Sequence, residues 1–154
     1  MTFTQKESTL LKDLKAQEQL CVQKYGSYAN EACDSNLKNL FNSIQQVEQG
    51  HLNSLNQLIG GQMPQTGQSG GQKPTWNGQC STSCSVDQRR RDYYLVSDAL
   101  ATEKHASSLY DTCIFEFNDT NVRDLLNHIQ KEEQQHGEQL NGYKSQCSQQ
   151  LGMQ

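Results

Sequence analysis

Two groups of three residues in this chain have the spacing of metal ligands in helical proteins. In each group a glutamate is followed 30 residues later by a second glutamate, and by a histidine three residues after that. The second group repeats the first at a constant offset, since 103 − 18, 133 − 48 and 136 − 51 all equal 85. The six residues are Glu18, Glu48, His51, Glu103, Glu133 and His136. Glu-x-x-His puts both side chains on one face of a helix, so the pattern predicts a site for two metal ions.

The chemistry of these six side chains indicates which metals to expect. The glutamates occupy positions that face the interior of a helix bundle, where an unpaired carboxylate costs several kcal/mol. Four such groups would take up protons or push the helices apart, whereas two divalent cations balance four negative charges. The ligand set favours iron or manganese over zinc, which prefers four ligands and often thiolates. A single Glu-x-x-His motif would fit ordinary surface residues equally well, but two matched motifs favour the metal site.

Tyr25 and Tyr110 each lie seven residues beyond the first glutamate of their group, on the same helix face. Such a tyrosine could simply fill the core, with its hydroxyl bonded to a neighbour. Alternatively, it could donate a hydrogen bond to a metal-bound carboxylate, or act as a redox-active phenol. These two residues are the candidate catalytic residues. His105 and His128 fall off the inward face, and we expect both to contact solvent.

The repeat extends to the apolar residues, which indicates four helices that position the ligands. A shift of 85 residues carries Leu40 to Leu125 and Ile44 to Ile129, and the apolar positions alternate steps of four and three. Such stepping is typical of the buried face of a bundled helix. The sequence therefore predicts an all-α fold, a four-helix bundle made of two duplicated helical hairpins.

The ligand spacing also locates the turns, because residues level with each other on a hairpin have the turn midway between them. The midpoints are Cys33 and Asn118, and each is followed by a helix-starting Asp-Ser or Asp-Thr pair. We predict helices over 5–30, 35–60, 87–116 and 120–148. One domain over 1–154 would contain hairpin one (5–60), a crossover loop (61–87) and hairpin two (88–148). The segment from Gly60 to Asp87 holds both prolines and most of the glycines. It is long enough to run the length of the bundle, which would make the second and third helices parallel.

The six cysteines divide into two sets. Cys21 and Cys113 lie on the buried helix faces and should behave as small apolar residues. In the crossover arrangement the other four should gather at one end of the bundle, either as disulfides or as thiols that cross-link molecules. These four are Cys33, Cys80, Cys84 and Cys147. The number of cysteines alone does not choose between the two states.

Composition excludes several classes of partner. The net charge of −4 argues against nucleic acid. No run approaches the roughly 18 apolar residues of a membrane span, and the N-terminus lacks the core of a signal peptide. We therefore expect a cytoplasmic protein with metal ions as partners and no membrane association. A homo-oligomer is compatible with the sequence.

The ligand set resembles that of the ferritin-like superfamily, and the residues around it resemble the coat protein F family of spore-forming bacteria. The similar segments are 11–18 (LKDLKAQE), 98–104 (DALATEK) and 115–126 (FEFNDTNVRDLL). The resemblance implies that Glu48 and Glu133 bridge the metals. It also implies a place in the spore coat, with coat proteins as partners.

The resemblance further implies that Glu18 with His51, and Glu103 with His136, complete the two metal shells. The chain departs from the pattern at one point. Val47 and Glu132 precede the bridging glutamates, and no carboxylate partner is evident for the distal nitrogen of either histidine.

Three functions are compatible with these observations. The first is a spore-coat or spore-associated protein whose di-metal site is mainly structural. The second is an oxidase, peroxidase or catalase that acts on O2 or H2O2. The third, metal storage, is the least favoured because it requires assembly surfaces that a single sequence does not reveal.

Overall fold

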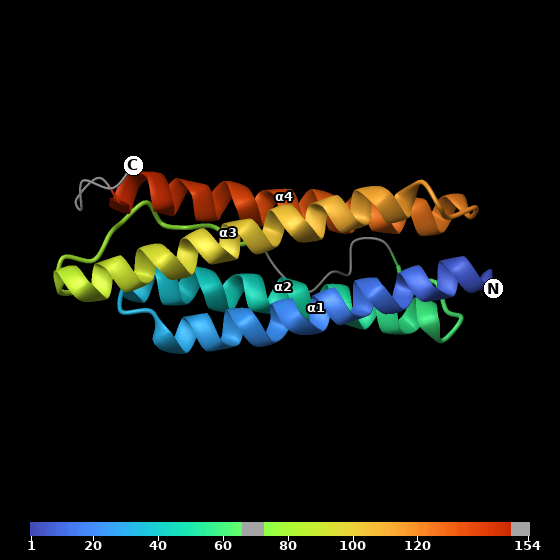
Figure 1. The fold of residues 1–154 in the computed structure, drawn as a ribbon, viewed down its shortest axis with the longest axis horizontal. Helices are drawn as coiled ribbons and strands as arrows, with labels where there is room; N and C mark the ends of the chain where they lie inside the picture. Colours follow the sequence, from blue (N-terminus) through green and yellow to red (C-terminus); the bar gives the residue numbers. More distant parts are fainter. Residues whose placement is uncertain (66–72, 149–154) are drawn as a thin grey trace.

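The computed structural model describes residues 1–65 and 73–148, which contain four long helices and no strand (Figure 1). The helices are α1 (Gln5–Glu31), α2 (Ser35–Ile59), α3 (Val86–Ile114) and α4 (Thr120–Ser148). Their ends agree with the predicted ranges to within two residues, so the all-α prediction is confirmed. Residues 66–72 of the predicted crossover lie outside the described residues.

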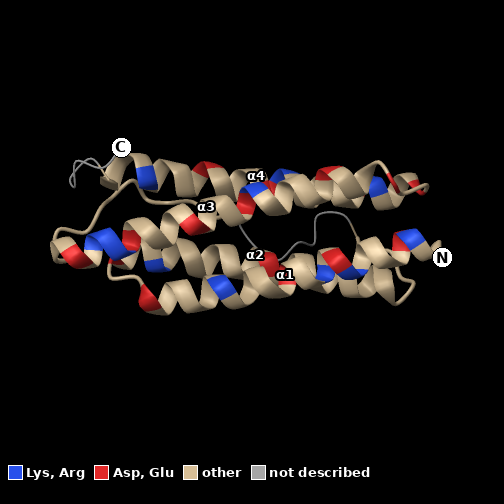
Figure 2. Ribbon diagram, in the orientation of Figure 1, with Lys and Arg blue, Asp and Glu red and all other residues tan. Residues whose placement is uncertain are grey.

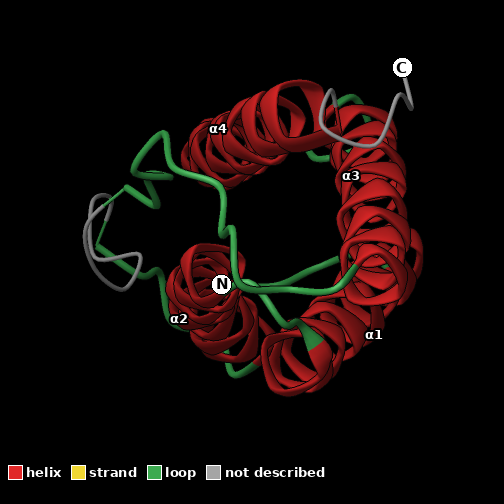
Figure 3. Cartoon of the chain, turned by 90° about the vertical axis from the view of Figure 1, so that its left-hand side faces the viewer, coloured by secondary structure: helices red, strands yellow, loops and turns green. Residues whose placement is uncertain are grey.

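The helices form two hairpins, α1 with α2 and α3 with α4, which pack against each other as a bundle (Figures 1 and 3). Helices α2 and α3 run in the same direction, as predicted. The described parts of the crossover lie at opposite ends of the bundle. Met63 packs against the apolar cluster near Leu11 and Phe117, whereas Trp76 packs against the cluster near Tyr143.

Local signals start each helix where the sequence predicts it. Asp34 accepts a hydrogen bond from the backbone N–H of Asn36 at 2.8 Å and caps α2. Asp119, its counterpart in the repeat, accepts one from the N–H of Asn121 at 2.7 Å at the start of α4. Helices α1 and α3 begin with capping boxes. In a capping box, the side chain of the N-cap residue accepts a hydrogen bond from the backbone N–H three residues later, and the side chain of that later residue accepts one from the N-cap N–H.

Each hairpin turn is held by an acidic residue of the other hairpin. Glu7 Oε2 accepts a hydrogen bond from the N–H of Asn118 at 3.3 Å. Its counterpart Asp92 accepts hydrogen bonds from the N–H groups of Cys33 and Asp34, both at 2.9 Å. The offset of 85 relates donors and acceptors alike, since 92 − 7 and 118 − 33 both equal 85. The duplication therefore extends to the contacts between the hairpins.

The apolar core is divided into two clusters with a polar layer between them. One cluster includes Tyr25, Phe41 and Leu140, and the other includes Leu55 and Tyr110. Along each helix the predicted ligands fall between residues of the two clusters. Charged residues of both signs are interspersed over the bundle (Figure 2). Among the described residues, no helix has the length and apolar character that crossing a membrane requires.

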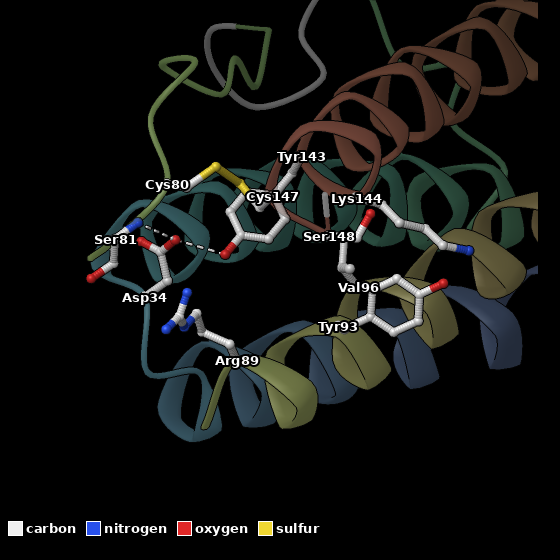
Figure 4. A pocket seen from close by; sticks show the side chains of 10 residues that line it. All are labelled: Asp34, Cys80, Ser81, Arg89, Tyr93, Val96, Tyr143, Lys144, Cys147 and Ser148. Atoms are coloured by element: carbon white, nitrogen blue, oxygen red, sulfur yellow. Dashed lines mark hydrogen bonds between the residues drawn. A yellow bond between two sulfur atoms is a disulfide. The ribbon is translucent and has the colours of Figure 1, made fainter. Parts of the chain in front are cut away.

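Two disulfides, Cys33–Cys84 and Cys80–Cys147, fasten the second part of the crossover to one end of the bundle. Figure 4 shows the second of them. The predicted gathering of these four cysteines is confirmed, and of the two open alternatives the structure has the disulfides. Between them, Asp34 Oδ2 accepts hydrogen bonds from the Ser81 N–H at 3.0 Å and the Tyr143 hydroxyl at 2.6 Å (Figure 4). Cys21 and Cys113 are buried free thiols, as predicted.

Removing either disulfide is expected to destabilise the bundle. The bridged cysteines are 51 and 67 residues apart, and closing loops of that size restricts the unfolded chain by about 4 kcal/mol each. Urea unfolding of the Cys33→Ser and Cys147→Ser variants, compared with the oxidised parent, measures the loss. Cys21→Ala is the matched control, because alanine occupies the equivalent position 106 and both disulfides remain. Equal stability of all four proteins would contradict this prediction.

Candidate metal centre

The six predicted ligands converge in the polar layer at the middle of the bundle. Each of the four helices contributes one glutamate, and α2 and α4 each add a histidine. All six side chains are buried. They form two overlapping groups of four residues. In each group, every residue offers one possible ligand atom, and these atoms all lie within 4.8 Å of one another. Glu48 and Glu133 belong to both groups, whereas each of the other four residues belongs to one.

Glu48 and Glu133 each lie between the two histidines. Glu48 Oε1 is 3.0 Å from Nδ1 of His136, and its Oε2 is 3.3 Å from Nδ1 of His51. Glu133 does the converse, with Oε1 at 3.2 Å from His51 Nδ1 and Oε2 at 3.5 Å from His136 Nδ1. A carboxylate that offers one oxygen to each side can bridge two metal ions.

Glu18 and Glu103 each face only one histidine. Glu18 Oε2 lies 3.8 Å from His51 Nδ1, and Glu103 Oε1 lies 3.4 Å from His136 Nδ1. Two half-sites follow, one around His51 with Glu18 and one around His136 with Glu103. Glu48 and Glu133 are common to both.

Tyr25 and Tyr110 bond to carboxylates of the opposite hairpin. The Tyr25 hydroxyl donates a hydrogen bond to Glu103 Oε1, and the Tyr110 hydroxyl donates one to Glu18 Oε1, both at 2.5 Å. Burial raises the pKa of both tyrosines well above its usual value, so each phenol stays protonated and remains a donor. Each tyrosine therefore orients the glutamate that faces a single histidine.

Replacing these tyrosines with phenylalanine is expected to weaken metal binding without unfolding the bundle. Tyr110→Phe leaves Glu18 without its donor, and Tyr25→Phe does the same to Glu103. Loss of a partner that orients a ligand lowers metal affinity by about 10–100-fold. Competition with a chromophoric chelator measures the affinity. Tyr28→Phe is the control, because that hydroxyl bonds to Asp98 instead. If Tyr25→Phe or Tyr110→Phe binds metal with the affinity of the parent protein, the tyrosine side chains only fill the core.

Without metal, the cluster holds protons in its place. Burial raises the pKa of Glu48 to about 7 and of Glu103 to about 8, with nearby negative charge adding to both shifts, and burial also raises the pKa of Glu18. Burial opposes charge on His51 and His136, but the surrounding carboxylates outweigh it and raise the pKa of both histidines well above its usual value. Burial favours protonation of Glu133 as well, but the polar neighbours Glu103, His136 and His51 prevail and lower its pKa.

Several side-chain atoms of the cluster that could bind a metal ion have no hydrogen-bond partner. Among the described residues, these buried atoms include Oε2 of Glu18 and of Glu103, both oxygens of Glu133, and Nε2 of His136. Buried polar atoms are normally satisfied, and an unsatisfied one costs about 1–3 kcal/mol. Carboxylate oxygens and imidazole nitrogens in this number suit iron or manganese. The residues present therefore fit two divalent ions.

One partner of the cluster was not identified from the sequence. Glu132 Oε1 lies 3.0 Å from Nε2 of His51, so this histidine does have a carboxylate at its distal nitrogen. The same oxygen is 3.3 Å from Nε2 of His128. His128 is half-buried and His105 is exposed, so both contact solvent as expected. The repeat places Val47 where the His136 half would need an equivalent carboxylate. The two half-sites thus differ in their surroundings.

Comparison with known families gives one match. Residues 91–147 match the family model of the Coat F domain. The match covers most of α3 and α4, and with them Glu103, Glu133 and His136. It supports the coat F family and a spore-coat-related protein. The first hairpin lies outside the Coat F match and is related to it through the internal repeat. No curated protein and no solved structure matches the chain.

Proposed function

We propose that this is a spore-coat-related protein with a ferritin-like bundle that binds two divalent ions, iron or manganese. The observation that carries the proposal is the position of Glu48 and Glu133, each with one oxygen toward either histidine. Four buried carboxylates without cations would be an unexplained cost to the fold. The Coat F domain supports the link to the spore coat.

The ligands divide into a bridging pair and two terminal pairs. Glu48 and Glu133 would contact both ions, Glu18 and His51 would hold one, and Glu103 and His136 the other. When bound, the pair of ions would supply Lewis-acid and redox chemistry. Tyr25 and Tyr110 keep the terminal glutamates oriented through their hydrogen bonds.

The disulfides support a location in the coat. Disulfides persist in oxidising surroundings and are rare in the cytosol. Cys33–Cys84 and Cys80–Cys147 tie the crossover to both hairpins, so the mature fold depends on an oxidising environment. We therefore propose the spore coat as the site of action, with coat proteins as partners.

Metal analysis tests the proposed function. The protein is loaded anaerobically with Fe(II) or Mn(II), desalted and measured for metal per chain. We expect about two ions per chain, one for each histidine half-site. Glu116→Gln is the control, since Glu116 pairs with Lys6 on the surface and should not affect loading. Failure of both metals to bind stoichiometrically would refute the di-metal site.

An oxidoreductase that acts on O2 or H2O2 is the second candidate. The observation that favours it is a cavity at the surface that is lined in part by Glu103 and Glu133. Consumption of oxygen or peroxide by the protein loaded with each metal distinguishes this role from a structural site. A structural site would bind two ions and consume neither.

A further inference from the structure

A cavity of about 280 Å³ opens at the surface between α3 and α4, and two of the proposed ligands are among the residues that line it. Exposed Lys104 and Gln134 line its outer part, and the buried Glu103 and Glu133 line its inner part. Gly137 contributes no side chain to it, and a Cβ added there would meet only Leu100 Cδ1 within 4 Å, at 3.7 Å. Solvent-sized molecules can therefore come next to two of the proposed ligand residues from this face, while Oε2 of Glu103 and both oxygens of Glu133 stay buried.

The equivalent face of the other hairpin is closed. The repeat replaces Gly137 by Leu52 and Ser107 by Val22. Leu52 and Val22 line a groove between α1 and α2, but Glu18 and Glu48, the counterparts of the buried glutamates, are not part of its lining in the described structure. The side chain of Leu52 occupies the position where Gly137 has only a hydrogen atom on the α3–α4 face. It therefore blocks the approach to Glu18 and Glu48 from the α1–α2 face.

A second difference marks the same half of the site. His136 Nε2 is buried and has no hydrogen-bond partner, whereas His51 Nε2 is 3.0 Å from Glu132. Val47 stands where the His136 half would need the equivalent of Glu132. The His51 half is thus enclosed and held by an additional carboxylate. The His136 half is adjacent to the cavity and less restrained.

We propose that small uncharged oxidants, dioxygen or hydrogen peroxide, reach the centre past Gly137 and bind on the side of Glu103 and His136. This inference rests on the proposed di-metal function and assigns an entrance and a reacting side to it. Leu100 and Gly137 add an apolar surface, which an uncharged molecule can cross without the large cost of taking a charge out of water.

Exchange of the two side chains at the entrance tests the proposal. Gly137→Leu introduces the residue that closes the other face, and Leu52→Gly removes it there. The readout is the rate at which nitric oxide, an uncharged diatomic probe, binds to the di-ferrous protein in a stopped-flow spectrometer. We expect Gly137→Leu to slow binding at least about tenfold, which corresponds to about 1.4 kcal/mol on the entry barrier. The double variant Gly137→Leu/Leu52→Gly should regain speed through the opposite face.

Metal content and a matched control separate the possible outcomes. Glu138→Leu adds the same side chain at the next position, which is exposed, and should bind the probe at the parental rate. Gly137→Ala and Gly137→Val give a graded series should the leucine variant not fold. With two ions bound, an unchanged rate across this series, or equal slowing by Glu138→Leu, overturns the entrance. If the parent protein binds no iron, the proposed function fails instead.

Discussion

Replacement of either Glu48 or Glu133 by glutamine is expected to abolish binding of both metal ions, whereas the same change at Glu18 or Glu103 mainly weakens one. Glu48 and Glu133 each present one oxygen to each histidine, but Glu18 and Glu103 each face only one histidine. Glutamine keeps the shape of the side chain and removes its charge. For Glu48 or Glu133, the affinity of the protein for both ions should fall by more than about 100-fold. Loss of a residue that only orients a ligand lowers metal affinity by about 10–100-fold, so the effect should be larger than that.

The four single variants form their own set of controls, because all remove one carboxylate from the same buried cluster. Isothermal titration with Fe(II) or Mn(II) gives the number of ions and their affinities. We expect no tight sites in Glu48→Gln and Glu133→Gln, and one tight site in Glu18→Gln and Glu103→Gln. Four identical binding curves would mean that the distinction between bridging and terminal ligands is wrong.

The metal-free protein is expected to become less stable as the pH rises from about 5.5 to 8. Glu48 has a pKa of about 7 and Glu103 of about 8 in the folded protein, against an ordinary value of 4.5. A carboxyl group with a raised pKa stabilises the fold while protonated, and this contribution is lost as the pH passes through the folded value. The raised pKa values of His51 and His136 act in the same direction above pH 6.5. The pKa of Glu133 is lowered, so this carboxyl stays ionised across the range and does not change the trend.

Each unit of pKa shift corresponds to about 1.4 kcal/mol, so the net loss should reach several kcal/mol. Urea unfolding of chelated protein at pH 5.5 and 8 measures the difference. Metal-loaded protein should behave oppositely, since metal competes with protons for the same ligands and binds better at higher pH. Glu48→Gln is the control, because its metal-free form lacks one titrating carboxyl. A metal-free protein that is equally stable at both pH values, with no change on chelation, would contradict this account.

The sequence alone was sufficient for the helices and for the six side chains that meet at the centre, because the duplication repeats both at one offset. Steps of four and three fixed the buried faces, and the midpoints between Glu18 and Glu48, and between Glu103 and Glu133, located the turns. These inferences depend on spacing along single helices, where 3.6 residues per turn determines which side chains share a face. The all-α fold and the helix ranges were therefore predictable.

Contacts between helices were less accessible to the sequence. The pairing of Glu132 with His51 depends on the rotation of α4 against α2, which spacing does not define. The hydrogen bond between Tyr25 and Glu103 was not predictable from spacing either. Tyr25 lies on α1 together with Glu18, but its hydroxyl bonds to Glu103 on α3, in the other hairpin. The sequence could place four cysteines at one end, but the pairing Cys33–Cys84 and Cys80–Cys147 required the path of the crossover.

Anomalous X-ray diffraction from crystals of the iron- or manganese-loaded protein tests the central claim most directly. We expect two peaks at the absorption edge of the metal, about 3.5–4 Å apart, with Glu48 and Glu133 between them. One peak should be bonded to His51 and Glu18, and the other to His136 and Glu103. A single ion at the cluster, or ions only at surface carboxylates, would contradict the di-metal centre.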